Sequence, residues 1–313
     1  MRDAHPGIFN KILKSLGVKK GTFCSIIAQV IPKNDLKGMF FMTFWQSVLA
    51  FMDSSMETPT TFGWFHLMWL AISFLALIPL LRFPKQQSQD HVRRVVLATA
   101  IIVIILEVYK MINFSFSYGD GVVFDFQWYA FPFQFCSTPM YIGLLAGLTK
   151  PGKFHDCLCA YLATFAVFAG TAVMIYPGDV FIETIGINIQ TMICHGSMIT
   201  IGIYLYATGH VKLGHKTILK AIPVFAVTLS LAMIMNEVFY KLNLTGGETF
   251  NMFYISPYYE NTLPIYSEVH KAVPAPWNVL IYIAGFAAAA YLMLLIAMGI
   301  GALVRKLRRP AAV

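Results

Sequence analysis

Charged residues are scarce in this chain of 313 residues, at 12% of the total, whereas hydrophobic residues make up 58%. A soluble domain averages about 25% charged residues, so a chain with half that share needs a solvent other than water. The sequence also lacks a phosphate-binding loop, a dinucleotide-binding fingerprint and a zinc-protease motif. These absences argue against energy-coupled pumping by this chain alone, and no cofactor is predicted.

Long runs of apolar residues recur along the sequence. Each approaches or exceeds the roughly 20 residues that a helix needs to cross the hydrocarbon core of a bilayer. The runs are 61–82, 95–113, 129–149, 157–176, 187–208, 218–240 and 278–304. The sequence therefore predicts an all-α, polytopic transmembrane helix bundle with seven core spans over 61–305, followed by a short tail at 306–313.

The positions of Lys and Arg explain the net charge of +8. Basic residues cluster in alternate connecting segments, at 82–94, 150–153, 212–220 and 305–309, and the segments between them carry mainly Asp and Glu. Because Lys- and Arg-rich loops stay on the cytoplasmic side, we expect a multi-pass protein of the cell membrane with a cytoplasmic C-terminus. The charge thus reflects topology, so membrane lipids and no nucleic acid are the expected partners.

Residues 1–60 form a separate, basic segment whose Lys and Arg residues place the N-terminus in the cytoplasm. An additional crossing is then needed before the first core span, and 38–52 is predicted to be a short span. The alternative is that 38–52 lies in the interface, with seven spans and a basic tail outside. A further interfacial helix is predicted at 22–31. Whether the chain forms homo-oligomers or has a partner subunit stays open.

Polar side chains within the spans gather at one depth. Such groups are costly inside hydrocarbon and mark a site by default. The predicted orientations place them in the half of the bilayer that faces away from the cytoplasm. They include His66, Glu107, Lys110, Gln134, Cys136, Ser137, Thr138, Asn188, Thr191, Cys194, His195, Asn236, Glu237 and Tyr240. Their convergence predicts a polar site in this half of the bundle.

Helical phase, at about 100° per residue, narrows this set to residues that share a face. These are Gln134, Ser137, Thr138 and Tyr141 on one helix, Asn188, Thr191 and His195 on a second, and Glu107 and Lys110 on a third. Cys136 and Cys194 lie off these faces, and we expect both to pack against neighbouring helices.

These polar residues can also have purely structural roles. Glu107 and Lys110 can neutralise each other one turn apart, and His66 can be an interfacial histidine. The hydroxyl and amide side chains can form interhelical hydrogen bonds. No metal site is predicted, because the five cysteines form no spacing typical of zinc.

The order of several short motifs resembles a known membrane family. The motifs are Phe-Gly-Trp-Phe-His-Leu at 62–67, Leu-Glu-Val at 106–108, Phe-Pro-Phe-Gln-Phe-Cys at 131–136, Cys-His-Gly at 194–196, and Asn-Met at 251–252 with a proline at 257. Over about residues 60–305, this order resembles the bacterial YwaF-like integral membrane family and the related transmembrane protein 164 family of animals.

The resemblance implies an acyltransferase that acts on phospholipids through a cysteine, allied to hydrolases that use a threonine and a histidine. The animal motif has cysteine and then histidine after its proline, where this chain has Phe133 and Gln134. Cys136 matches the final cysteine of the bacterial motif, and His195 and Glu107 match the histidine and the acid of the family. The nucleophile of the animal family is therefore absent at its matching position.

Two functions follow. In the first, the protein is an acyl-transfer enzyme or lipid hydrolase in which His195 is the general base and Glu107 orients it. Asn188 or Asn236 would donate a hydrogen bond to the oxyanion. The candidate catalytic residues are His195, Ser137, Thr138, Cys136 and Glu107.

In the second, the pocket binds a small polar solute or a lipid headgroup without chemistry. Lys110 would meet an anion, and Glu107 or Glu237 would exchange a proton, as in transporters. The candidate binding residues are His66, Lys110, Gln134, Tyr141, Asn188, Asn236 and Glu237. Whether the chain is an enzyme is left open by the sequence.

Overall fold

The computed structural model describes residues 33–83, 87–118, 121–178 and 180–307, with the backbone alone for 33–42. The interfacial helix predicted at 22–31 and the end of the C-terminal tail lie outside the described residues. Contacts divide the chain into two compact units, one with the N-terminal helix and 116–124, and one with the remaining residues from 53 onwards.

The smaller unit consists of α3 (Lys33–Met52) and a hairpin formed by β1 (Phe116–Tyr118) and β2 (Val122–Phe124). The strands are antiparallel, with Phe116 opposite Phe124, and α3 contacts both. Residues 38–52 are helical, as predicted, and the helix begins five residues earlier. Whether it crosses a membrane or lies in the interface stays a prediction. The hairpin was not predicted, because three-residue strands are too short to show an alternating pattern.

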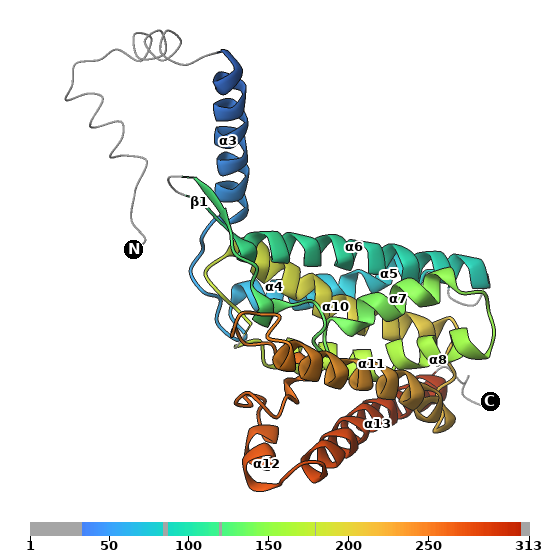
Figure 1. The fold of residues 1–313 in the computed structure, drawn as a ribbon. Coiled ribbons are helices and arrows are strands. Elements are labelled where there is room, and N and C mark those ends of the chain that lie inside the picture. The colour runs from blue at the N-terminus through green and yellow to red at the C-terminus, as the bar shows by residue number, and fades with distance from the viewer. Residues whose placement is uncertain (1–32, 84–86, 119–120, 179, 308–313) are drawn as a thin grey trace. The chain divides into compact units, whose positions relative to one another are not determined.

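The larger unit is a bundle of helices (Figure 1). Its elements are α4 (Trp64–Leu75), α5 (Leu77–Leu80), α6 (Gln89–Ser115), η2 (Trp128–Ala130), α7 (Thr138–Leu148), α8 (Lys153–Leu162), α9 (Phe165–Ile175), α10 (Ile185–Ala207), α11 (Lys216–Lys241), η3 (Met252–Tyr254), α12 (Tyr266–Ala272) and α13 (Trp277–Leu307). The prediction of an all-α bundle is confirmed for this unit.

Within the described residues, four helical segments are long and apolar enough to cross a membrane. These are Gln89–Ser115, Lys153–Ile175, Lys216–Lys241 and Trp277–Leu307. Two shorter apolar segments, Trp64–Leu80 and Thr138–Leu148, accompany them. α10 has sufficient length at 23 residues, but its polar side chains lower its mean hydropathy. The chain is therefore a helical membrane protein with four candidate spans.

The helix predicted at 129–149 is wrong over its first half. The apolar run at 129–149 is helical only from Thr138, and the backbone at 131–137 is irregular. Pro132 is the cause, because a proline pushes the residue before it out of the helical region, and Phe131 has an extended ψ of 133°. Pro139 then occupies the first turn of α7, where its missing N–H is tolerated.

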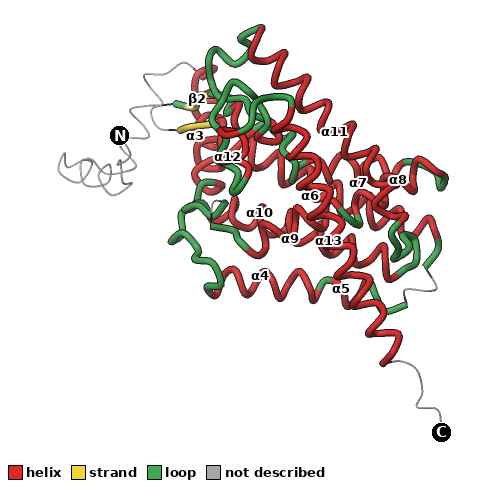
Figure 2. The backbone as a smooth tube through the Cα atoms, turned by 90° about the horizontal axis from the view of Figure 1, so that it is seen from below, coloured by secondary structure: helices red, strands yellow, loops and turns green. Residues whose placement is uncertain are grey.

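The centre of the bundle is formed by α8, α9 and α10. The most apolar part of the α8–α9 segment is 67% buried, against 17% for α13. α10 contacts α4, α6, α8 and α9, and α4 and α11 lie on opposite sides of α9 and α10 (Figure 2). Gly170 permits a close approach, since a Cβ there would lie 2.5 Å from the His195 carbonyl oxygen. α9 thus supports α10 at the predicted site.

Candidate functional site

A buried ion pair lies on α6. Lys110 Nζ donates to Glu107 Oε1, and their side chains are 17% and 7% exposed. A charged group inside a membrane bundle requires a partner, because its desolvation is costly. The pairing predicted from the i,i+3 spacing is therefore present, and it neutralises both charges.

Gln190 on α10 connects this pair to the next helix. Its Nε2 donates to Glu107 Oε2 at 3.0 Å and lies 3.3 Å from Cys194 Sγ, and its Oε1 accepts from Thr191 Oγ1 at 3.4 Å. Gln190 was missed in the sequence. Its position one helical turn before Cys194 could have identified it, because this spacing places both side chains on the α10 face toward α6.

His195 has one bonded and one unpaired ring nitrogen. Nδ1 donates to the Thr191 carbonyl at 2.7 Å, while Nε2 is buried and has no hydrogen-bond partner among the described residues. A carbonyl can only accept, so the proton is on Nδ1 and Nε2 carries a free lone pair. The orienting group is thus the Thr191 carbonyl. The expectation that Glu107 orients His195 is wrong, because Nδ1 bonds to the Thr191 carbonyl and Nε2 bonds to no described residue.

Both cysteines pack against apolar side chains of other elements, in line with the expectation from helical phase, and both also lie in the electrostatic range of the ion pair. Cys136 and Cys194 both interact electrostatically with Glu107 and Lys110, and His195 interacts with Lys110. For Cys136, the step of about 100° per residue does not apply, because 131–137 is not helical. For Cys194, the relevant face of α10 is the one that carries Gln190.

The hydroxyls beside Cys136 differ in their availability. Thr138 Oγ1 donates to the Phe135 carbonyl at 2.8 Å, which leaves it to accept from the Tyr161 hydroxyl at 2.7 Å. Ser137 is 9% exposed and directly follows Cys136 in the chain. The proton of Thr138 is thus committed to the backbone, whereas Ser137 lies next to the polar cluster.

Two amides predicted to face a substrate instead hold a loop. Gln134 donates to the Asn251 carbonyl at 2.9 Å and accepts from the Phe253 N–H at 2.8 Å. Asn236 donates to the Met252 carbonyl at 2.9 Å and accepts from the Met252 N–H at 2.7 Å. Irregular backbone inside hydrocarbon must be fully hydrogen-bonded. Both side chains therefore satisfy the loop backbone.

Asn188 and His66 are structural in the same way. Asn188 accepts from the Ile182 N–H at 2.9 Å and donates to the Ile182 carbonyl at 2.7 Å. His66 accepts from the Phe62 N–H at Nδ1, 2.9 Å, and donates from Nε2 to the Met174 carbonyl at 3.0 Å. Both side chains are fully buried. They tie segments together and do not join the cluster on α6 and α10.

Tyr141 and Glu237 complete the predicted set. Tyr141 donates to the Pro132 carbonyl at 2.9 Å and lies within electrostatic range of Glu107. The Glu237 side chain is 43% exposed and pairs with Lys241 at 2.5 Å. It also accepts from the Tyr258 hydroxyl at 2.7 Å, and this bond raises the pKa of Tyr258. Glu237 is therefore a surface residue, away from the cluster.

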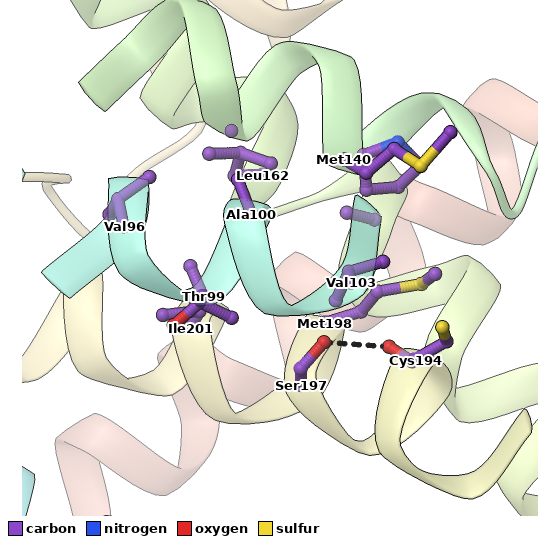
Figure 3. Close-up of a pocket in the computed structure, with 13 residues that line it drawn as sticks. Val96, Thr99, Ala100, Val103, Met140, Leu162, Cys194, Ser197, Met198 and Ile201 are labelled. Atoms are coloured by element: carbon purple, nitrogen blue, oxygen red, sulfur yellow. Dashed lines mark hydrogen bonds between the residues drawn. The ribbon is translucent and has the colours of Figure 1, made fainter. Parts of the chain in front are cut away.

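An apolar cavity of about 30 Å³ adjoins the cluster between α6, α7, α9 and α10 (Figure 3). Cys194 forms part of its wall, together with Val103 and Met140. Ser197 also lines it, but its hydroxyl donates to the Cys194 carbonyl at 2.8 Å. Among the described residues, no group of three or more His, Cys, Asp or Glu side chains is placed to hold a metal ion.

The site on α6 and α10, referred to below as the α6–α10 cluster, thus consists of Glu107, Lys110, Cys136, Gln190, Cys194 and His195. No curated protein and no solved structure matches the chain. Residues 61–297, which include every member of the cluster, match the TMEM164 family. Because this match covers most of the chain and the whole of the bundle except the end of α13, the protein belongs to the TMEM164 family.

Proposed function

We propose that this protein is a membrane-embedded acyl-transfer enzyme or lipid hydrolase, with Cys136 as nucleophile and His195 as general base. The unpaired Nε2 of His195 carries the proposal. A buried imidazole whose Nδ1–H is held by a carbonyl has its lone pair on Nε2, so it can accept a proton from a thiol that comes within hydrogen-bond reach. In the structure Cys136 does not hydrogen-bond to Nε2, so the proposed proton transfer requires the two side chains to move together. The family resemblance implies cysteine chemistry, but its cysteine position is Phe133 in this chain, so Cys136 would act from a different position.

Cys136 is the preferred nucleophile because a thiol is intrinsically more nucleophilic than the hydroxyls beside it. It lies in the electrostatic range of Lys110, as does His195, and also in that of Glu107, which opposes the effect of Lys110. Thr138 is the least suitable of the three candidates, since its hydroxyl proton is donated to a carbonyl. Ser137 remains the second choice, because it neighbours Cys136.

The proposed reaction has two acyl-transfer steps. His195 Nε2 accepts the thiol proton of Cys136, and the sulfur attacks the carbonyl carbon of a lipid ester. The ester C–O bond breaks, the leaving alkoxide takes the proton from His195, and a thioester remains on Cys136. An acceptor hydroxyl, or water in the hydrolase, then gives its proton to His195, attacks the thioester and releases the thiol. Lys110 would stabilise the negative charge that develops on the carbonyl oxygen.

Acylation of the purified full-length protein in nanodiscs tests this proposal. With an alkyne-tagged acyl thioester as probe, we expect a label on Cys136, identified by mass spectrometry. The label should be absent in Cys136→Ala and should form about 100-fold more slowly in His195→Phe, the low end of the usual contribution of a general base.

Cys157→Ala is the matched control, since Cys157 is another partly buried free cysteine of the bundle outside the α6–α10 cluster. It should be acylated at Cys136 at the normal rate. A label that persists in Cys136→Ala on Ser137 would reassign the nucleophile. Wild-type rates of acylation in His195→Phe would contradict the role of His195.

A binding protein for an anionic solute or lipid headgroup is the alternative. The buried Glu107–Lys110 pair favours it, because an anion could replace Glu107 as the partner of Lys110. Glu237 offers no support for this alternative, since it is paired at the surface. The expected signature is the absence of acylation, together with a ligand-induced rise in Tm that is lost in Glu107→Gln.

We also propose the finer points of topology and relationship. These are seven core spans, the cell membrane as location, a cytoplasmic C-terminus, and membership of the bacterial YwaF-like branch of the family. The alternation of basic and acidic connecting segments supports the orientation. Single cysteines placed in a cysteine-free variant at 151 and 243 should react with an impermeant maleimide only from the cytoplasmic and only from the outer side, respectively.

A further inference from the structure

A groove of about 220 Å³ lies between α4–α5 and α6, with α10 as its floor. Trp69 and Leu80 mark its extent along α4–α5, and Val103 and Ile193 lie at the end toward Trp69. Val103 is one helical turn before Glu107, and Ile193 precedes Cys194. No member of the α6–α10 cluster lines the groove, but one end of it lies within about one helical turn of Glu107 and beside the residue that precedes Cys194.

The groove adjoins the smaller cavity at Cys194. Both are lined by Thr99, Val103, Ser197 and Ile201, the residues at the contact of α6 with α10. The groove and the smaller cavity thus lie on either side of the contact between α6 and α10. Movement of these few side chains would join them into a single apolar space beneath the cluster.

The groove has hydroxyl-bearing residues, but it presents no free hydroxyl proton. Ser73 donates to the Trp69 carbonyl at 2.9 Å, Thr99 to the Val95 carbonyl at 3.0 Å, and Ser197 to the Cys194 carbonyl at 2.8 Å. Thr200 donates to the carbonyls of Gly196 and Ser73 at 2.9 and 3.0 Å. The exposed lining is therefore hydrocarbon, which suits an apolar occupant better than water.

One side-chain donor of the lining is unsatisfied. The indole N–H of Trp69 is buried and has no acceptor among the described residues. A buried donor without a partner is costly. The nitrogen is covered in the structure, so an occupant with one acceptor at the Trp69 end, such as an ester carbonyl, would satisfy this donor once the indole turns toward the groove.

The mouth of the groove faces the outside of the bundle. Ile72 on α4 and Ile102 on α6, which stand on its two sides, are 41% and 52% exposed. In a membrane protein, exposed apolar side chains at mid-helix contact lipid tails. The medium next to the groove is therefore hydrocarbon chains.

We propose that this groove holds one acyl chain of a membrane phospholipid, inserted sideways from the bilayer, with its ester carbonyl at the Trp69 end. The inference rests on the proposed function, for which it names the site of the substrate's acyl chain. The ester would lie at the end of the groove nearest Cys194 and Glu107, and the chain would extend along α10 toward Leu80.

A photoreactive lipid tests the proposal directly. The full-length protein is reconstituted in nanodiscs of phosphatidylcholine that contains a trace of phosphatidylcholine with a mid-chain diazirine, and the cross-linked residues are mapped by mass spectrometry. We expect labels on groove residues such as Ser197 and Ile102 to exceed those on Leu292 and Ile296, which are exposed on α13. Labels of equal strength on α13 and in the groove would mean general lipid contact and would overturn the proposal.

Two matched variants test whether the groove is the binding site, because one should fill the groove and the other should leave it open. Ala76 lines the groove, whereas Ala71 on the same α4–α5 segment is exposed and does not. Ala76→Trp should lower groove labelling about tenfold, because a large side chain in limited space excludes the chain, and Ala71→Trp should leave it unchanged. Equal labelling in both variants, or a cross-link from the groove to a second copy of the chain, would contradict the acyl chain as occupant.

The Cys136→Ala variant separates this inference from the proposed function. Groove labelling should persist in that variant, because chain binding precedes any acyl transfer. Groove labelling without acylation of Cys136 in the wild type would refute the proposed reaction and leave the chain site standing. Acylation of Cys136 without groove labelling would refute the chain site alone.

Discussion

Around the loop at 251–253, the side chains of Gln134 and Asn236 bond to backbone atoms, whereas around Glu107 the polar side chains of α6 and α10 bond mainly to one another. Both regions are buried in the same bundle. In the loop region every amide oxygen and nitrogen has a backbone partner. In the α6–α10 cluster, Nε2 of His195 has none.

The difference separates polar residues that build the fold from those available for chemistry. Backbone partners cannot move away without breaking the fold, so a side chain saturated by them is unavailable to a ligand. Side chains that bond to each other can exchange partners at smaller cost. The two histidines show the same contrast, since His66 has two backbone partners and His195 has one.

The largest loss of stability is expected when the Glu107–Lys110 ion pair is broken. Lys110→Met leaves Glu107 buried with Gln190 as its remaining partner, and breaking a buried pair costs about 3–5 kcal/mol. The double variant Lys110→Met/Glu107→Gln should recover most of that loss. Denaturant unfolding in micelles measures both. A double variant no more stable than the single one would show that the pair itself, and not its neutrality, is needed.

Removing the Asn236 amide, which bonds to the loop at 251–253, should lower the free energy of unfolding by nearly as much. Asn236→Ala leaves the Met252 N–H without a partner and weakens its carbonyl's bonding, so we expect a loss of about 3 kcal/mol. Met233→Ala, on the exposed side of α11 one turn earlier, is the control and should have little effect on Tm. Comparable losses in both variants would remove the distinction between the two regions.

The two histidines should respond differently to phenylalanine. His66→Phe abolishes two bonds to backbone atoms and should cost about 2 kcal/mol of unfolding free energy. His195→Phe should cost less than about 1 kcal/mol, because the Thr191 carbonyl keeps its bond within α10, yet it should slow acylation of Cys136 about 100-fold. Thermal unfolding and acylation are measured on the same preparations. A larger loss of stability in His195→Phe than in His66→Phe would reverse the assignment.

The smallest effect is expected at Glu237. Glu237→Gln breaks an exposed pair with Lys241, and exposed ion pairs contribute little to stability. We expect no measurable change in Tm and unchanged acylation. Loss of acylation in this variant would contradict the assignment of Glu237 as a surface residue away from the site.

The helices could be predicted wherever they are apolar throughout. The run at 95–113 lies within α6, and that at 278–304 lies within α13, because the length of an apolar run is set by the thickness of the hydrocarbon core. The run at 129–149 misled because Pro132 interrupts a helix without interrupting hydrophobicity. From that error followed the wrong expectation that Gln134 points to the site, whereas its amide bonds to the loop backbone.

The sequence by itself determined that this protein is a helical membrane protein with costly polar groups near one end of its spans. Composition and run length are sufficient for that, since they decide which solvent the chain requires. Only the tertiary structure decided the partner of each polar group. Gln190 reaches Glu107, and the irregular segment at 131–137 places Cys136 within range of Lys110, through contacts between residues far apart in the chain. Such contacts depend on how helices pack and where loops turn, which helical periodicity does not specify.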